Sequence, residues 1–421
     1  MRFTEPRGST IFTPFGVRDF RLLWIGESVS ILGDRFFAIG LPWLVLQLTG
    51  SGFALGSIFM TSALPYSALM LAGGAVVDRF TPRRVMLVSN VFRGLSVFVL
   101  AALLFTHTTK MWHLYVLSAI FGTCEGFFHP ADFAVLPTLL DSEQLPAGNS
   151  LMFAVARFWG LIGPLLAGLV ISWSGLGVVF GIDAASFVVS VTMLSLMSTP
   201  TILTPISQEP LTLSIRQGIS DALAHSMIRP LLLAYAILNM LLTGAFSVGL
   251  PLMAKERFGD AAHLGLLYSS LGGGGLVGTL LAGHLRRQHK LGSVLVSSYL
   301  SSGVLLVCAG LLWHVKVLAA VLFMCGAIGG YANLNTLASL QCQIEIGKMG
   351  RLMSLIMFCN QGLAPLSCLA AGLLSRMGST LLLVASGVSA IAIMPILFRA
   401  PQLWREWNLE LSSSEDQPVS S

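Results

Sequence analysis

Apolar residues gather into about twelve long runs, and short polar segments separate one run from the next. Each run has the roughly 20 residues that an α-helix needs to cross a bilayer. None shows the alternation with period two that marks the strands of a membrane barrel. Because helices and closed barrels alone satisfy every backbone group in lipid, the pattern predicts transmembrane helices. The expected spans are 22–48, 53–77, 85–105, 113–139, 149–173, 178–197, 231–254, 264–284, 293–313, 317–341, 352–374 and 380–398.

The second half of the chain echoes the first at an offset of about 200 residues. Doubled helical bundles of this kind usually surround a central path through the bilayer. The pattern predicts an all-α integral membrane protein with twelve transmembrane helices in two pseudo-symmetric six-helix bundles, and transport is the leading hypothesis. The matching positions are Leu151, Met152, Pro164, Gly122, Gly126 and Phe127 in the first half and Leu352, Met353, Pro365, Gly326, Gly330 and Tyr331 in the second.

The composition requires the bilayer as solvent. Of 421 residues, 55% are hydrophobic and 10% are charged, and the mean hydropathy is +0.81. A soluble core cannot bury this much apolar surface. The six cysteines fall inside apolar runs, so we interpret them as packing residues and expect no disulfide, metal or cofactor. No signal-peptide pattern precedes the first span, which is expected to target the membrane itself.

Positive charges are distributed unevenly between the two sets of loops. If both termini lie on one side, sixteen of the 24 lysines and arginines share that side and five lie in the opposite loops. Positive loops of membrane proteins stay on the cytoplasmic side. We therefore predict a multi-pass protein of the cell membrane with both termini cytoplasmic. The same bias accounts for the pI near 9.0 without a nucleic-acid partner.

Composition also divides the chain into five expected parts. The segment between the halves is richer in Pro, Ser, Thr and charge, and residues 211–226 can form an amphipathic helix on the inner surface. The polar end of the chain is expected to be disordered. The expected parts are a cytoplasmic N-terminus (1–21), a six-helix bundle (22–197), a cytoplasmic linker (198–229), a second six-helix bundle (230–398) and a cytoplasmic tail (399–421).

The short loop after the second span carries a charged signature. It reads GAVVDRFTPRR over residues 74–84, which resembles the G-x3-D-R-x-G-x-R-R signature of the major facilitator superfamily, with Thr81 in place of the second glycine. The resemblance implies a gate in which Asp78 contacts basic side chains or a helix N-terminus in one conformation only. The alternative is that the arginines only set the topology. The predicted gating residues here are Gly74, Asp78, Arg79, Arg83 and Arg84.

The fifth span contains a glycine motif. It reads GLIGPLLAG over residues 160–168 and is similar to the G-x-x-G-P-x-x-G-G motif of antiporters in that superfamily, with Ala167 in place of a glycine. Small residues let helices pack closely, and proline removes a backbone hydrogen bond and bends the helix. We interpret the motif as a place where one half rocks against the other, and ordinary helix packing is the alternative. The motif residues are Gly160, Gly163, Pro164 and Gly168.

Longer stretches resemble one branch of the superfamily. Residues 121–169, the pair Gly33-Asp34 and residues 350–354 are similar to macrolide-efflux and enterobactin-exporter-like proteins. The resemblance implies an exporter and does not name its substrate. The arginine that many antiporters carry in the fourth span would fall at Gly122, so that charge is absent. Arg93 and Arg157 are the available substitutes.

Ionisable residues inside spans are costly, so they are functional candidates. Glu27 and Asp34 lie at i and i+7 in the first span, and Glu125, His129 and Asp132 lie at i, i+4 and i+7 in the fourth. Each set therefore shares one helix face. At about 1.5 Å per residue, Asp34 and Glu125 both approach the midplane, where a lone carboxylate can exchange a proton as access alternates. We predict proton or cation binding at Asp34 and Glu125, with Glu27 as a further candidate.

By the same rise, Asp132 and Arg157 lie at similar depths, so we predict a structural or gating ion pair between them. Structural alternatives stay open for the other intramembrane charges. Asp34 could be paired permanently with Arg35 or with another span. Glu27 could be solvated at the membrane interface. Arg93 and Asp183 could form structural ion pairs with partners that the sequence does not name.

The second half offers polar but uncharged side chains within its spans. We predict that its tenth and eleventh spans contribute to a substrate cavity, and hydrogen bonding between helices is the alternative for each residue alone. The candidates are Tyr331, Asn333, Asn335, Asn360 and Gln361.

These observations lead to one interpretation with several rivals. We expect a monomeric secondary transporter that exports an amphipathic small molecule, such as a drug, a macrolide-like compound or a siderophore, by alternating access in exchange for protons. Rival transport hypotheses are a dedicated metabolite or lysolipid transporter and a proton-coupled importer. A membrane enzyme, sensor or scaffold is the remote alternative, because the face formed by Glu125, His129 and Asp132 lacks the spacing of a zinc site.

Overall fold

The computed structural model describes residues 11–198, 228–284, 291–342 and 362–393, and every element in these ranges is helical. Residues 199–227 of the predicted linker, the tail, Asn360 and Gln361 lie outside the described residues, and the last two linker positions belong to the first helix of the second half. The first half contains α1 (Arg18–Thr49), α2 (Gly52–Arg79), α3 (Pro82–Phe105), α4 (Met111–Val135), α5 (Leu145–Ser174) and α6 (Leu176–Leu196). The second contains α8 (Ile228–Gly244), α9 (Leu250–Arg257), α10 (Ala261–His284), α11 (Leu291–Leu311), α12 (Val315–Cys342), α14 (Ala364–Leu374) and α15 (Ser379–Ala392).

The helices confirm the predicted membrane architecture. In the described part of the chain, nine helices are long and apolar enough to cross a bilayer, and two shorter apolar helices lie at residues 364–377 and 379–392. α4 is not among the nine and carries Glu125, His129 and Asp132. The predicted seventh span is one continuous helical path in which a π-helical turn, Ala245–Gly249, joins α8 to α9.

Glycines let helices of the same half approach closely, and they lie at matching places in the two halves. A Cβ at Gly122 of α4 would lie 2.9 Å from Cα of Ser62 on α2. A Cβ at Gly326 of α12, the counterpart of Gly122, would lie 2.9 Å from the backbone N of Gly275 on α10. The repeat noticed in the sequence at Gly122 and Gly326 therefore marks equivalent helix contacts in the two halves, where only a residue without a side chain fits.

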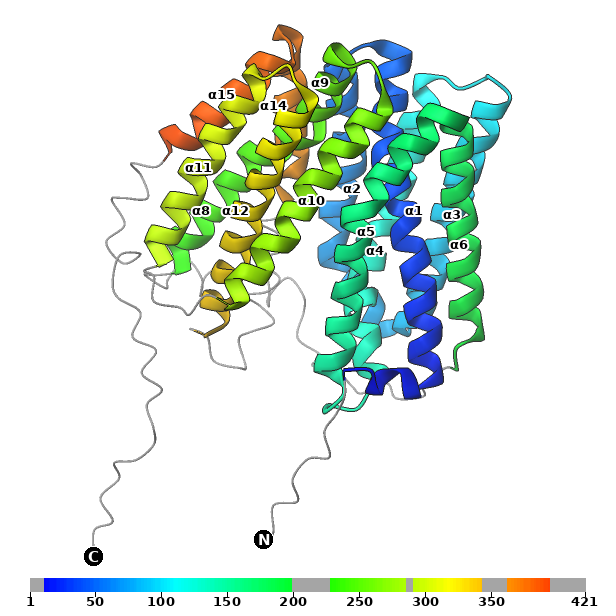
Figure 1. The fold of residues 1–421 in the computed structure, drawn as a ribbon. Helices are drawn as coiled ribbons and strands as arrows, with labels where there is room; N and C mark the ends of the chain where they lie inside the picture. Colours follow the sequence, from blue (N-terminus) through cyan, green and yellow to red (C-terminus); the bar gives the residue numbers. More distant parts are fainter. Residues whose placement is uncertain (1–10, 199–227, 285–290, 343–361, 394–421) are drawn as a thin grey trace, which may run out of the picture.

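The two halves lean together at one end. We call the end where α1 begins the near end and the opposite end the far end. Figure 1 shows the helices of the halves approaching each other at the far end and spreading apart toward the near end. Two helix pairs make the principal contacts, α5 with α10 and α2 with α14. These pairs occupy equivalent positions in the two halves, so the contact between the halves follows the same repeat.

At the far end, a short turn between α1 and α2 reverses the direction of the chain. α1 ends at Gly50, which has φ of 62° and donates its backbone N–H to the carbonyl of Leu46 at 2.9 Å. A left-handed residue at this place is the usual end of a helix and favours glycine. α2 begins two residues later, where the Ser51 side chain accepts from the N–H of Ala54.

Candidate functional site

A buried arginine lies at the centre of the first half. Arg93 comes from α3, and its side chain is 1% exposed. Its guanidinium donates to Oδ1 of Asp34 on α1 at 2.7 Å and lies 3.8 Å from Oε1 of Glu125 on α4. The structure thus brings together both predicted proton-binding carboxylates around one cation, and we call these three residues the Arg93 cluster.

Aromatic rings hold the Arg93 guanidinium in place. Its central carbon lies 4.6 Å from the ring centroid of Phe121, 5.1 Å from that of Phe128 and 4.8 Å from that of Phe187. Cation–π contacts of this kind grow stronger when the cation is removed from water. Asn90 accepts from Arg93 at 3.4 Å and donates to Ser190 on α6 at 3.0 Å, which ties α3 to α6.

The two carboxylates of the cluster are less enclosed than the cation. The side chain of Asp34 is 34% exposed and that of Glu125 is 30% exposed. Arg35, the neighbour suggested by the sequence as a possible partner of Asp34, forms no ion pair with it in the described part of the chain. The partner of Asp34 is Arg93 of another span, and the Asp34 side chain remains partly exposed.

Two further carboxylates lie buried in the same half. Asp183 on α6 is fully buried, and neither of its side-chain oxygens has a hydrogen-bond partner among the described residues. Gly33 makes room for it on α1, because a Cβ there would lie 2.5 Å from Oδ1 of Asp183. Glu27 is 4% exposed, so it is not a carboxylate solvated at the membrane interface. Both acids are thus enclosed in the same half as Arg93, Glu27 on α1 and Asp183 on α6.

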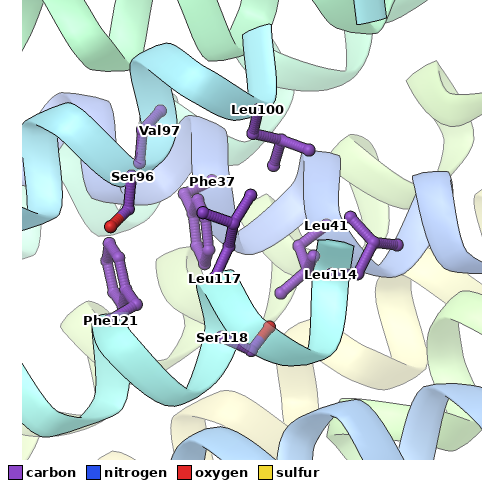
Figure 2. Close-up of a pocket in the computed structure, with 9 residues that line it drawn as sticks. All are labelled: Phe37, Leu41, Ser96, Val97, Leu100, Leu114, Leu117, Ser118 and Phe121. Atoms are coloured by element: carbon purple, nitrogen blue, oxygen red, sulfur yellow. The ribbon is translucent and has the colours of Figure 1, made fainter. Parts of the chain in front are cut away.

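An apolar layer separates the cluster from the far end. Figure 2 shows side chains of α1, α3 and α4 that surround a cavity of about 10 Å³, the space of roughly one water molecule. Phe37 and Phe121 stack here with centroids 4.4 Å apart and rings within 5° of parallel. Leu41, Leu100 and Leu114 continue the layer toward the far end. Mostly apolar side chains therefore lie between the cluster and the far end of these helices, with Ser96 and Ser118 as the polar members of the lining.

The predicted ion pair between Asp132 and Arg157 is not formed in this structure. No ion pair joins them in the described part of the chain, and Arg157 instead lines a cavity between the halves. Asp132 stays on the α4 face with Glu125 and His129, whose ring packs against Tyr66 at 5.6 Å. Equal depth along two helices did not place these side chains face to face.

The charged loop after α2 has one clear anchoring contact. Arg83 donates to the carbonyl oxygens of Leu194 and Ser195, at 2.6 and 2.7 Å, where α6 ends. A cation at this end satisfies free carbonyls and complements the helix dipole. Arg79 lies 5.9 Å from the ring of Phe80. Arg84 is exposed. Gly74 and Asp78 belong to α2, and the surroundings of their side chains lie outside what the structure describes.

The glycine motif of α5 lies against α10. A Cβ at Gly168 would lie 3.1 Å from Cα of Gly265, so the two backbones meet directly. The N–H of Leu165, the residue after Pro164, donates to Oγ of Ser269 on α10 at 2.9 Å. Gly163 faces α1, where its Cβ would lie 2.7 Å from Cβ of Arg35. The remaining motif residue, Gly160, lines the cavity between the halves.

Polar contacts close the far end between the halves. Ser172 at the end of α5 donates to the carboxylate of Asp260, and the N–H of Ala262 donates to Ser172 at 3.2 Å. Partial burial opposes the charge on Asp260, but the hydrogen bonds outweigh it and hold the pKa of this carboxyl below its ordinary value. Asp260 is therefore ionised at neutral pH. Lys255 also lies 5.1 Å from the ring of Trp43 across the same contact.

A cavity of about 590 Å³ lies between the halves. Of the substrate-cavity candidates, Asn333 lines it, while Tyr331 and Asn335 are joined to each other by a hydrogen bond of 2.8 Å along α12. The sequence did not assign the cavity its two arginines, Arg35 and Arg157. A charged residue within an apolar span was the available signal. The sequence does not show, however, which side of the helix bundle each arginine side chain would face.

Paired helices around a central cavity, with charges buried in one half, define a multi-pass membrane transporter for a small molecule rather than an enzyme. The chain belongs to the major facilitator superfamily, whose family model matches residues 23–367. The resemblance noted in the loop after α2 is thereby confirmed.

The chain is similar to several curated relatives over most of its length. Enterobactin exporter EntS of Shigella boydii serotype 18 (strain CDC 3083-94 / BS512) is 27% identical over 344 residues, which cover 79% of each chain. Enterobactin exporter EntS of Citrobacter koseri (strain ATCC BAA-895 / CDC 4225-83 / SGSC4696) is 26% identical, again over 79% of each chain.

Solved structures share the fold at low sequence identity. A POT family transporter in complex with 5-aminolevulinic acid has a TM-score of 0.74 and 15% identity, over 92% of this chain and 97% of that one. A bacterial homologue of the iron transporter ferroportin in an inward-facing state has a TM-score of 0.71 and 18% identity, over 92% of this chain and 99% of that one. At these identities the likeness concerns the fold alone.

Proposed function

We propose that this transporter exports an amphipathic small molecule by alternating access in exchange for protons, and that Asp34 and Glu125 bind the proton. The observation that carries the proposal is the sharing of one buried guanidinium by two carboxylates. The names of the similar exporters support the outward direction and make a siderophore one candidate substrate.

The net charge of the Arg93 cluster favours the binding of a proton. Arg93 neutralises one carboxylate, so the three groups together carry one negative charge unless a proton is bound. A net charge inside a membrane protein is costly, and a proton on Asp34 or Glu125 removes it. The partial exposure of both carboxylates gives the proton access, while Arg93 remains enclosed.

Alternating access would connect this cluster to each side in turn. The proposed orientation places the near end, with its positive loops, in the cytoplasm of a cell membrane. In the present conformation the cluster would then release its proton toward the cytoplasm while substrate enters the cavity. Rocking of the halves about the contacts of α5 with α10 and of α2 with α14 would open the far end, where a new proton displaces the substrate.

The test is counter-transport in proteoliposomes under an imposed pH gradient. Lipophilic dyes, macrolides and catechol-type chelators are offered as substrates to the wild type, Asp34→Asn and Glu125→Gln. We expect gradient-driven movement of at least one compound, and about a tenfold or greater loss in either variant, because each removes a charge-assisted contact.

Glu143→Gln is the matched control, because Glu143 is exposed in the polar segment between α4 and α5. It should transport like the wild type. Substrate movement that does not depend on the pH gradient, and that is unchanged in Asp34→Asn and Glu125→Gln, would contradict proton exchange. It would indicate a facilitator or flippase.

A further inference from the structure

The cavity between the halves contains two arginines that the Arg93 cluster does not use. We propose that Arg35 and Arg157 bind the anionic group of the transported molecule, so that the substrate is an amphipathic anion. This inference rests on the proposed transport function and adds the chemical class of the substrate.

Both arginines reach the cavity from the first half. Arg35 comes from α1 and Arg157 from α5, and both line the same space of about 590 Å³. Cavities of about 300–1,000 Å³ accommodate drug-sized molecules. The two arginines therefore line, from the first half, a space that is large enough for a whole ligand.

Neither guanidinium has an ion-pair partner in the described part of the chain. The carboxylate next to Arg35 in the sequence, Asp34, is directed to Arg93 instead. Arg35 also has a buried Nε without a hydrogen-bond partner among the described residues. An enclosed polar atom without a partner is costly, and a ligand that accepts its hydrogen bond would remove the cost.

Two like charges in one cavity select the sign of the ligand. Guanidinium groups repel a cation and match the planar, two-oxygen geometry of carboxylate and similar anions. Elsewhere in this structure a buried arginine has acidic partners, as Arg93 does. Arg35 and Arg157 have no such partners in the described part of the chain, and an anionic ligand would supply one.

The wall from the second half suits an apolar body. Leu242, Phe246 and Leu271 line it from α8, the π-helical turn and α10. Glycines of α10 and α12 leave the space open, and Ser302 and Asn333 add a few polar groups. A ligand would thus lie with its anionic group against α1 and α5 and its apolar part against the second half.

The experiment compares two probes that differ in charge and share most of their shape. 8-Anilinonaphthalene-1-sulfonate is anionic, and N-phenyl-1-naphthylamine is its neutral counterpart. Saturable binding of each is measured on the full chain in lipid nanodiscs, without a pH gradient, for the wild type, Arg35→Gln and Arg157→Gln. We expect each substitution to weaken binding of the anionic probe about tenfold or more, because a charge-assisted hydrogen bond is lost. Binding of the neutral probe should be unchanged.

Arg376→Gln is the matched control, because Arg376 lies against Phe53 near the far end and does not line the cavity. Arg157→Lys keeps the charge and should retain part of the affinity, which separates loss of charge from misfolding. Absence of saturable binding of the anionic probe to the wild type, or equal loss for both probes, would overturn the inference.

The outcome is separable from that of the transport test. Arginine-dependent binding of the anion together with gradient-independent transport would leave the anion site standing and refute proton exchange. Proton-driven transport of a cationic or neutral compound, with no charge preference in binding, would support proton exchange and refute the anion site.

Discussion

A single buried cation organises the first half of this transporter. Arg93 draws together α1, α3 and α4 through Asp34 and Glu125, and three aromatic rings cover its guanidinium. The arrangement also explains the absence of an arginine at Gly122. The backbone of α2 meets α4 there, so a side chain at Gly122 would separate the two helices. The cation arrives from α3 instead.

At the residue scale, Arg93→Gln should destabilise the protein, because it leaves Asp34 without its cation. Removing one partner of a fully buried ion pair costs about 3–5 kcal/mol, and the partial exposure of Asp34 makes the expected cost here smaller. Thermal unfolding of the detergent-purified protein, followed by the loss of the monodisperse peak after heating, should show a lower midpoint.

The double variant with Asp34→Asn should recover part of that loss, since it removes the stranded carboxylate as well. Arg84→Gln is the control, because Arg84 is exposed near the start of α3. An unchanged midpoint for Arg93→Gln, or no recovery in the double variant, would show that the ion pair does not stabilise this half.

At the element scale, paired helices meet where neither has a side chain. Gly168 on α5 meets Gly265 on α10, and Gly56 on α2 meets Gly372 on α14 with a hypothetical Cβ to Cα distance of 2.9 Å. Small residues at these places let the two backbones approach closely. The motif that resembles that of antiporters therefore has a direct packing role at the contact between the halves.

Gly168→Leu should prevent closure of the far end, because the new side chain has no space between α5 and α10. Spin labels at cysteines replacing Leu48 and Met377, both exposed at the far end, should report longer distances between the halves than in the wild type. Transport should be lost while the protein remains folded.

Gly181→Leu is the matched control, since a Cβ at Gly181 has nothing within 4 Å. Unchanged label distances in Gly168→Leu would mean that the contact between α5 and α10 does not set closure of the far end.

At the scale of the whole molecule, this conformation is closed at the far end and spread at the near end (Figure 1). Ser172, Asp260 and Ala262 form the polar part of the closed end. Because Asp260 stays ionised at neutral pH, these contacts do not themselves respond to the proton. Our proposal places the response to pH in the Arg93 cluster, away from the closing contacts.

The proposed orientation predicts which membrane face exposes the cavity. In a variant without native cysteines, Phe153→Cys on the cavity wall should react with a membrane-impermeant thiol reagent in inside-out vesicles and not in intact cells. Met377→Cys at the far end should react in intact cells. The reverse pattern would place the termini outside.

The sequence by itself determined the helical membrane architecture and the doubled plan. Both follow from one-dimensional quantities, because a bilayer demands long apolar runs and a repeat is visible as an offset. It also singled out Asp34, Glu125 and the glycine motif, since charges and small residues within apolar runs are conspicuous.

Only the tertiary structure decided which side chains meet. Depth along a helix follows from residue number, but the neighbouring helix and the direction of each side chain around its axis do not. Asp132 and Arg157 therefore share a depth without pairing, while Asp34 meets Arg93, 59 positions away. The same reason explains why Arg35 and Arg157 became part of the cavity only once α1 and α5 were in place: a binding site is formed by the faces that packing leaves open.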